Sequence, residues 1–158
     1  MDKLINDEVN GTVLAISISD KRGIKKKNVE VAELEEDFGI INDAHAGKWH
    51  RQVSILTIKS MQQIKDKGLD VKPGDFAENI CIDGIDFSKI SVGTKIKIGE
   101  NSLLEVSQIG KECHARCHIY YSVGDCVMPR EGIFTRVLKG GEIKPADKVW
   151  LVENAPLV

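Results

Sequence analysis

The sequence has little of what marks nucleic-acid-binding or membrane-spanning proteins. Its 22 basic and 24 acidic residues leave a formal net charge of −2. The net charge therefore does not predict binding to nucleic acid or to a membrane surface. No uninterrupted apolar run approaches the roughly 18–20 residues that a membrane-spanning helix needs. The first eight residues also lack the apolar core of a secretory signal peptide. We therefore expect a cytoplasmic protein with no nucleic-acid and no membrane partner.

Aromatic side chains are also scarce, at 5% of the chain, whereas glycine occurs 14 times. Segments rich in β-branched residues and separated by glycine are typical of strands joined by turns. We predict one helix over residues 58–67, with Met61 packed inside, and strands over residues 11–19, 29–34, 53–57, 78–82, 94–98, 103–109 and 148–152. Strands spaced by about 8–12 residues favour a barrel or a sandwich. The fold class is therefore mostly β with some α, in a single domain over residues 1–158.

The cysteines are the most unusual feature. Three of the four, together with two of the four histidines, lie between Cys113 and Cys126. Thiols stay reduced in the cytoplasm, so this cluster indicates metal, redox or sulfur chemistry rather than disulfides. A zinc site is one alternative, although no second closely spaced cysteine pair is present, and no metal ligand is assigned. Covalent haem is another, but Cys113-x3-Cys117-His118 has one residue too many and haem attachment generally needs export.

A reactive thiol is the third interpretation of the cluster. The neighbouring cation of Arg116, or a protonated histidine, favours the thiolate of Cys117. Such a thiolate accepts sulfur as a persulfide or binds a soft metal, with Cys113 or Cys126 as auxiliary thiols. Cys81 lies in an apolar strand and is expected to be a packing residue.

Polar residues in the long loop over residues 35–50 and just after it form a second candidate site. Asp43, His45 and Arg51 could line a pocket for an anion, because a guanidinium offers a planar fork to phosphate or carboxylate. The alternative is that Asp43 and His45 only satisfy the backbone of a turn. Arg130 could point into the same pocket or pair with Glu131. The basic run over residues 21–27 is expected to be a solvated loop, with a phosphate-binding patch as the alternative.

Taken together, these segments resemble the MOSC domain, named for the C-terminal domain of molybdenum-cofactor sulfurases. The resemblance lies in residues 39–47, 51–54, 73–79 with Gly84, 92–94, 116–117 and 124–141. It implies a compact β-barrel with peripheral helices, in which Cys117 is the characteristic cysteine and Asp43, His45 and Arg51 line the pocket beside it. Asn42 and Ala77 stand where the family often has glycine. Asparagine tolerates a left-handed backbone.

The resemblance also implies a function. We expect a stand-alone MOSC-like protein that carries sulfur on Cys117 or binds the molybdenum cofactor (molybdopterin), with Arg116 and Arg130 among its ligand-binding residues. A sulfur donor such as a cysteine desulfurase and a molybdoenzyme acceptor would be its partners, and no pyridoxal phosphate is expected in this domain. Whether the chain is an enzyme is left open. The alternatives are a non-covalent binding module for an anionic pterin or phosphate, and a zinc-stabilised interaction domain.

Overall fold

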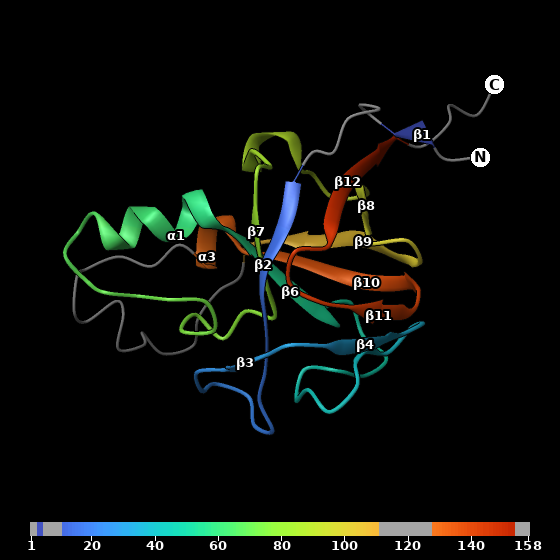
Figure 1. Ribbon diagram of the computed structural model, residues 1–158, viewed down its shortest axis with the longest axis horizontal. Coiled ribbons are helices and arrows are strands. Elements are labelled where there is room, and N and C mark those ends of the chain that lie inside the picture. The colour runs from blue at the N-terminus through green and yellow to red at the C-terminus, as the bar shows by residue number, and fades with distance from the viewer. Residues whose placement is uncertain (1–2, 5–10, 111–127, 154–158) are drawn as a thin grey trace.

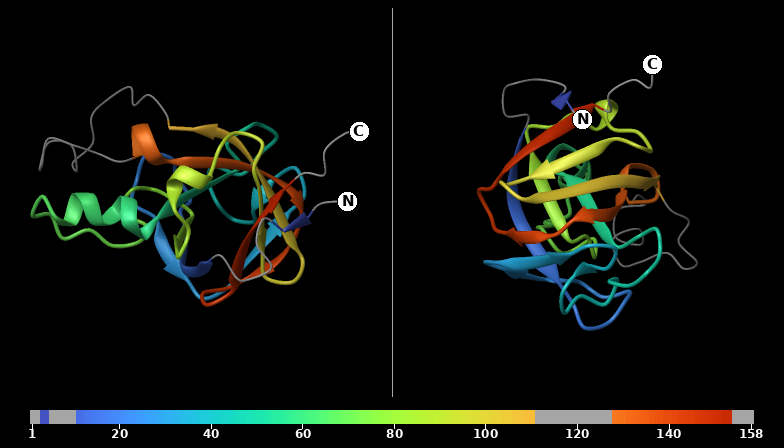
Figure 2. Two further views of the ribbon diagram at one scale, coloured as in Figure 1. Left: turned by 90° about the horizontal axis from the view of Figure 1, so that it is seen from above. Right: turned by 90° about the vertical axis from the view of Figure 1, so that its right-hand side faces the viewer.

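The structure is a computed structural model that describes residues 3–4, 11–110 and 128–153. Seven strands form a closed barrel (Figures 1 and 2). Around the barrel their order is β12 (Lys148–Glu153), β8 (Lys95–Ile98), β9 (Ser102–Ile109), β10 (Ile133–Lys139), β6 (Val53–Thr57), β7 (Ile80–Asp83) and β2 (Gly11–Ile18). Pairing of β12 with β2 closes the ring. Strands β6 and β7 pair in parallel, and the other neighbours in the ring pair antiparallel.

Shorter elements surround the barrel. Strand β1 (Lys3–Leu4) extends β12, and β3 (Lys27–Val29) extends β2. A second sheet contains β11 (Gly141–Ile143), β4 (Ala32–Glu35) and β5 (Gly39–Ile40). The helices in the described ranges are α1 (Ile58–Lys65), α3 (Met128–Glu131) and the 3-10 turn η1 (Phe87–Lys89). Figure 1 shows α1 and α3 together at one side of the barrel. The predicted β-barrel with peripheral helices is confirmed.

The barrel interior is filled by branched aliphatic side chains. In β8 the isoleucines of the Lys-Ile-Lys-Ile sequence are buried and the lysines half-buried, as a period of two requires. All five residues of β6 are buried, because the strand packs on both faces. Val53 and Ile55 join the barrel core, and Leu56 joins a second cluster with Met61 and Ile64. At β6, the outer face of the barrel wall is therefore covered by this second apolar cluster.

Helix α1 provides part of that cover. Thr57 caps its N-terminus by accepting a hydrogen bond from the Ser60 backbone N–H at 3.1 Å. Met61 and Ile64 are fully buried, which confirms the predicted helix and the packing role of Met61. The helix also makes the connection between the parallel strands β6 and β7, where a hairpin would be too short. Within the described ranges, no helix is long and apolar enough to span a bilayer.

The prediction and the structure differ over residues 29–34 and at β10. The strand predicted over residues 29–34 is two strands, because β3 ends at Val29 on the barrel and β4 begins at Ala32 on the second sheet. Strand β10 is not among the predicted strands, although its sequence Ile-Phe-Thr-Arg-Val-Leu-Lys is rich in strand-forming residues. It pairs with both β9 and β6 in the ring.

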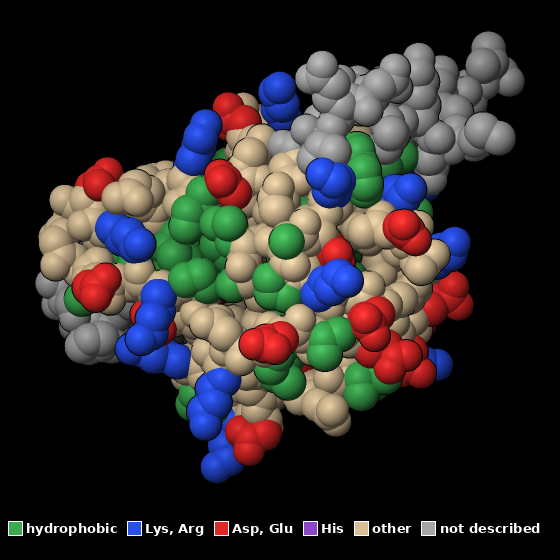
Figure 3. Space-filling view, in the orientation of Figure 1, with side chains coloured by type: hydrophobic (Ala, Val, Ile, Leu, Met, Phe, Trp, Pro, Cys, Tyr) green, Lys and Arg blue, Asp and Glu red, His purple; other side chains and the backbone are tan. Residues whose placement is uncertain are grey.

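Acidic and basic side chains are interspersed over the face of the molecule shown in Figure 3, which agrees with the small net charge.

Candidate functional site

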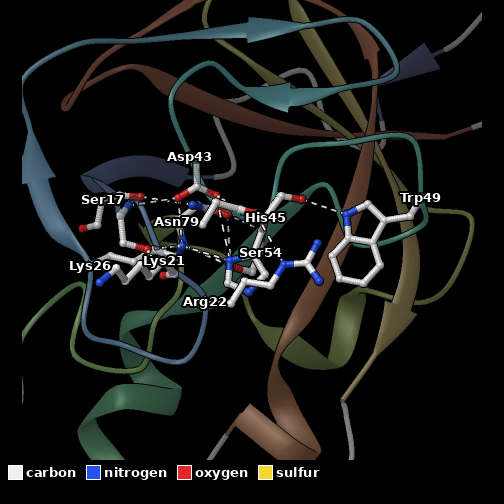
Figure 4. A network of polar contacts seen from close by, with 11 residues as sticks. Ser17, Lys21, Arg22, Lys26, Asp43, His45, Trp49, Ser54 and Asn79 are labelled. Atoms are coloured by element: carbon white, nitrogen blue, oxygen red, sulfur yellow. Dashed lines mark hydrogen bonds and ion pairs between the residues drawn. The ribbon is translucent and has the colours of Figure 1, made fainter.

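The outer face of the barrel meets three loops at the candidate site. Ser54 on β6, Asn79 before β7 and Ser17 on β2 form its base, and all three are buried. The Asn79 amide bridges the strands, because Oδ1 accepts from the Ser54 backbone N–H at 3.0 Å and Nδ2 donates to the Ser17 carbonyl at 3.1 Å. Residues of the loops over 20–26 and 42–52 lie over this base (Figure 4), and the third loop, the turn over residues 73–76, bonds to the backbone of Lys26.

Asp43 occupies the centre of the site, with its side chain fully buried. Asn42 before it has φ of 74°, a left-handed backbone that asparagine tolerates. The chain turns tightly here, and Asp43 Oδ2 accepts from the His45 backbone N–H at 3.1 Å. This is the turn-satisfying role proposed as the alternative for Asp43. The same carboxylate also bonds outside its own turn, because Oδ1 accepts from the Ser19 backbone N–H at 3.1 Å.

Lys26 is the counter-charge of this buried carboxylate. Its ammonium lies 2.8 Å from Asp43 Oδ1, and neither side chain is exposed to solvent. It also donates to Ser19 Oγ at 3.0 Å and lies 2.9 Å from His45 Nδ1. The expectation of a solvated basic loop is therefore wrong for Lys26, whose neighbours Lys25 and Lys27 are exposed as expected. Sequence reasoning missed this residue because nothing local distinguishes it from the lysines beside it.

Trp49 brings three cationic or polar side chains together at the surface of the site. Its ring lies parallel to that of His45, at 7° and 6.5 Å between centroids, and its Nε1 donates to the His45 carbonyl at 2.7 Å. The guanidinium of Arg22 lies 4.5 Å from the Trp49 ring centroid and that of Arg51 lies 4.6 Å from it. Figure 4 shows Arg22 extending toward Trp49. These are cation–π distances, so one ring holds two arginines from different loops.

The guanidinium of Arg51 contacts aromatic rings, and no acidic side chain is seen to pair with it in the described part of the chain. Besides Trp49, the Phe134 ring lies 5.7 Å from its guanidinium. The Arg51 Nε atom is buried and has no hydrogen-bond partner among the residues that the structure describes. A buried donor without an acceptor costs about 1–3 kcal/mol. The predicted grouping of Asp43, His45 and Arg51 is therefore observed, with Trp49 as the link between the last two.

The turn over residues 73–76 contacts the backbone of Lys26. The Lys26 backbone N–H donates to the Gly74 carbonyl at 2.9 Å, and a Cβ at Gly74 would lie 2.3 Å from the Lys26 carbonyl oxygen. Glu78 holds this turn by accepting from the Gly74 and Phe76 N–H groups at 2.9 and 3.2 Å. Burial raises the pKa of Glu78 to about 7, although those hydrogen bonds act against the shift. This carboxyl group therefore titrates near neutral pH.

A short polar chain connects the site to the end of β9. His50 Nε2 and Gln108 Oε1 lie 2.8 Å apart, and Gln108 Nε2 donates to the Gly110 carbonyl at 2.7 Å. Ser107 Oγ donates to the His50 carbonyl. Gly110 is the last described residue before the segment that carries the cysteine cluster. The predicted site residues Cys113, Arg116, Cys117 and Cys126 lie outside the described residues.

Arg130 lies on α3, beside α1. Its Nη2 donates to Gln63 Oε1 at 2.6 Å and its Nε to Glu131 Oε2 at 3.3 Å, so the pairing with Glu131 considered in the sequence analysis is observed. A place for Arg130 in the Asp43 pocket stays a prediction. Burial raises the pKa of Glu131, but hydrogen bonds from Ser60, Gln63 and Arg130 outweigh it and leave the pKa lowered. Glu131 thus joins α3 to α1.

Neither a metal site nor a second thiol site is found in the part of the chain described. No group of three or more His, Cys, Asp or Glu side chains there could hold a metal ion. Cys81 is 1% exposed and packs with Leu56 and Met61. Burial raises the pKa of its thiol to about 12. Its predicted packing role is confirmed, and it does not supply a thiolate.

The sequence matches the family model of the MOSC domain over residues 42–150, which is more than half of the chain. The chain belongs to the MOSC domain family. No curated protein matches the sequence significantly. Asp43, His45, Trp49 and Arg51 fall within the MOSC span, whereas Arg22 and Lys26 precede it. The buried counter-charge of Asp43 is thus supplied from outside the matched span.

Solved structures share the MOSC fold of this chain. The YuaD protein from Bacillus subtilis superimposes with a TM-score of 0.75 at 16% identity, covering 92% of this chain and 97% of that one. YiiM from Escherichia coli gives a TM-score of 0.63 at 19% identity, over 93% and 72% of the two chains. YiiM from Geobacillus stearothermophilus gives 0.62 at 18%, over 92% and 75%. At such identities these likenesses show the fold alone.

Proposed function

We propose that this MOSC protein binds a ligand of the molybdenum-cofactor type through its anionic groups, with Cys117 as the thiolate that binds metal or accepts sulfur. The observation that supports the ligand is Arg51. Its guanidinium is fixed over Trp49, and its buried Nε lacks an acceptor among the described residues. An anionic oxygen would satisfy that donor and would remove the cost of leaving it unpaired.

The residues around Arg51 fit an anionic ligand. Arg22 adds a second guanidinium at the same ring, and the Asp43 carboxylate, which would repel an anion, is fully buried and neutralised by Lys26. Described residues offer no metal-binding group, so a bound molybdenum would take its protein ligand from the cysteine segment, and the family resemblance assigns that role to Cys117. The cofactor would supply a metal centre that accepts sulfur.

Sulfur transfer through Cys117 needs a persulfide donor, such as a cysteine desulfurase. The Cys117 thiolate attacks the outer sulfur of the donor persulfide, a new S–S bond forms at Cys117, and the donor leaves as a thiolate. A molybdenum cofactor or molybdoenzyme is the proposed acceptor in the next step. Arg116 and the neighbouring histidines would favour the anionic forms of Cys117 throughout.

Intact-mass measurement after incubation with a desulfurase and cysteine tests the sulfur step. We expect wild-type protein to gain one sulfur atom that a thiol reductant removes, and Cys117→Ala to gain none. Cys81→Ala is the matched control, because the buried Cys81 thiol is not expected to take part. Absence of added sulfur, or its persistence in Cys117→Ala, would reject a carrier role.

Binding of molybdenum cofactor released from a molybdoenzyme tests the ligand. We expect Arg51→Gln to weaken binding by about tenfold or more, since the loss of a charge-assisted hydrogen bond costs about 1.5–3 kcal/mol. Arg51→Lys should recover part of the affinity only, because an ammonium keeps the charge without the planar fork. Arg136→Gln is the matched control, since Arg136 is exposed on β10.

The donor set at Arg51 also favours the second candidate, a non-covalent binding module for an anionic pterin or phosphate. In that case Arg51 would matter and Cys117 would not. Cys117→Ala with unchanged cofactor affinity, together with no sulfur loading of wild-type protein, would select this candidate over the first.

A further inference from the structure

Lys26 uses all three of its N–H donors inside the buried cluster. The acceptors are Asp43 Oδ1 at 2.8 Å, Ser19 Oγ at 3.0 Å and His45 Nδ1 at 2.9 Å. An ammonium group has donors and no acceptor, so the third contact requires that Nδ1 of His45 carry no proton. A neutral imidazole with a bare Nδ1 has its proton on Nε2.

The other groups near His45 support the same tautomer. Asp43 Oδ2 lies 3.9 Å from Nδ1, which is beyond hydrogen-bond range, and it already accepts from the His45 backbone N–H. A second proton on the ring would place a cationic N–H against the Lys26 ammonium. The remaining described charges at this ring stack, Arg22 and Arg51 on Trp49, are also cationic. Among the charges that the structure describes around His45, the buried Asp43 is the one that favours a charged imidazole.

We infer that Lys26 is a positioning residue that fixes His45 as a neutral Nε2–H donor, and that the cluster around Trp49 therefore binds fully deprotonated oxyanions in preference to protonated ones. Any group that meets Nε2, from a ligand or from the chain, has to be an acceptor. The ligand part rests on the proposed function, because it takes the anion site at Arg51 as given. The tautomer part does not depend on it.

The preference follows from the kind of hydrogen-bonding groups present. Arg22 and Arg51 offer donors alone, and a protonated Nε2 prevents His45 from accepting, whereas the side-chain acceptors described in the cluster are engaged. Asp43 is fully buried under three hydrogen bonds, and Ser19 Oγ accepts from Lys26 while donating to the Lys21 carbonyl at 2.8 Å. Sulfate brings acceptors only. Hydrogen phosphate has a similar shape and the same charge at pH 8, but its O–H needs an acceptor that the described side chains of this cluster do not offer.

Long-range proton–nitrogen NMR correlation of the histidine rings tests the tautomer in the free protein. His45→Gln assigns the signals, because one ring spin system disappears. We expect His45 to show an unprotonated Nδ1 and a protonated Nε2 throughout about pH 5–8, the range over which an ordinary histidine titrates. A protonated Nδ1, or an ordinary titration of the ring in this range, would overturn the inference whatever ligand the protein binds.

Two variants assign the effect to Lys26. Lys26→Met removes the donor but leaves Asp43 buried without its counter-charge, so it carries a folding risk. The double variant Lys26→Met/Asp43→Asn removes both charges and is the informative one if the single variant does not fold. In either folded variant we expect His45 to become a mixture of tautomers or to titrate. A ring that stays locked as Nε2–H would show that Lys26 is not responsible.

Fluorescence of Trp49 tests the ligand class. The chain has two tryptophans, so a Trp150→Phe background isolates the signal of Trp49. At pH 8 we expect sulfate to bind about tenfold or more tightly than hydrogen phosphate, the effect of one unpaired polar group. Equal binding, tighter phosphate binding or no response to either ion would overturn the preference. A failed sulfur-loading assay with the expected NMR and sulfate results would reject the carrier role of Cys117 and leave this inference standing.

Discussion

Lys26 lies between two exposed lysines and is itself buried against a carboxylate. At the residue scale, whether a charged side chain of the site is buried depends on the partner that it meets and not on its residue type. Asp43 was identified from its place in a loop motif, yet its burial is tolerable only because a cation from a loop 17 residues earlier reaches it. A buried charge without a partner would be strongly destabilising.

Lys26→Met should therefore lower the free energy of unfolding by about 3–5 kcal/mol, the usual cost of removing one partner from a buried ion pair. Adding Asp43→Asn should recover part of this loss, since no uncompensated charge is then buried. Urea unfolding of the single and double variants measures both values. Equal losses in the two variants would contradict the pairing as the cause.

Ala77 stands where the family often has glycine, and its φ is 62°. A left-handed backbone costs an alanine roughly 1–2 kcal/mol, whereas glycine adds about 0.4–1 kcal/mol of entropy to the unfolded chain. We expect Ala77→Gly to stabilise the protein by about 0.5–1 kcal/mol, measured as a higher thermal midpoint. Ala44→Gly, at a position without a positive φ, should instead lower the midpoint. A lower midpoint for Ala77→Gly would contradict the strain.

At the scale of elements, the turn over residues 73–76 connects the titration of one carboxyl group to the site. Glu78 bonds to the turn, and the turn accepts the backbone N–H of Lys26. The sequence Pro-Gly-Asp-Phe is typical of a turn. The role of Glu78 was not predicted, because its burial depends on β2 and β7 lying side by side.

Glu78 predicts an unusual pH dependence of stability. Its pKa is about 7 in the folded protein, compared with 4.5 for an ordinary glutamate. Between these values the folded state holds a proton that the unfolded chain has lost, so stability falls as pH rises from about 4.5 to 7. The expected loss is of the order of 3 kcal/mol. Above about pH 7, Glu78 changes the stability little further.

Urea midpoints at pH 5 and pH 8 measure this loss. Glu78→Gln cannot titrate, so its midpoint should change less between the two values than that of wild-type protein. Glu33→Gln is the matched control, because Glu33 is exposed on β4, and it should keep the wild-type pH dependence. The same change of midpoint in wild-type and Glu78→Gln would contradict the assignment.

At the scale of the whole molecule, closure of the barrel places the three site loops over one outer face. Strand β2 pairs with β7 on one side and with β12 on the other. Gly11 lies at this junction, opposite Val149, and a Cβ there would lie 2.3 Å from the Asp83 carbonyl oxygen. The strands can approach this closely only because the position has no side chain.

Gly11→Val should therefore destabilise the barrel by about 1–3 kcal/mol, as overpacking commonly does. Thr12→Val is the matched control at the next position, which is half-buried, and it should change stability little. Urea unfolding monitored by the fluorescence of Trp150 on β12 reports on the closure. Wild-type stability in Gly11→Val would contradict the close approach.

The sequence by itself determined the strand-rich class, most of the strands, the helix predicted over residues 58–67 and observed over 58–65, and the grouping of Asp43, His45 and Arg51. These depend on local preferences, such as the alternation in β8, or on motifs that lie close together in the chain. Only the tertiary structure decided that Lys26 is buried, that Trp49 holds two arginines and that Glu78 titrates near neutral pH. The physical reason is that burial and charge pairing depend on residues that are brought together by barrel closure, and local sequence does not encode those distances.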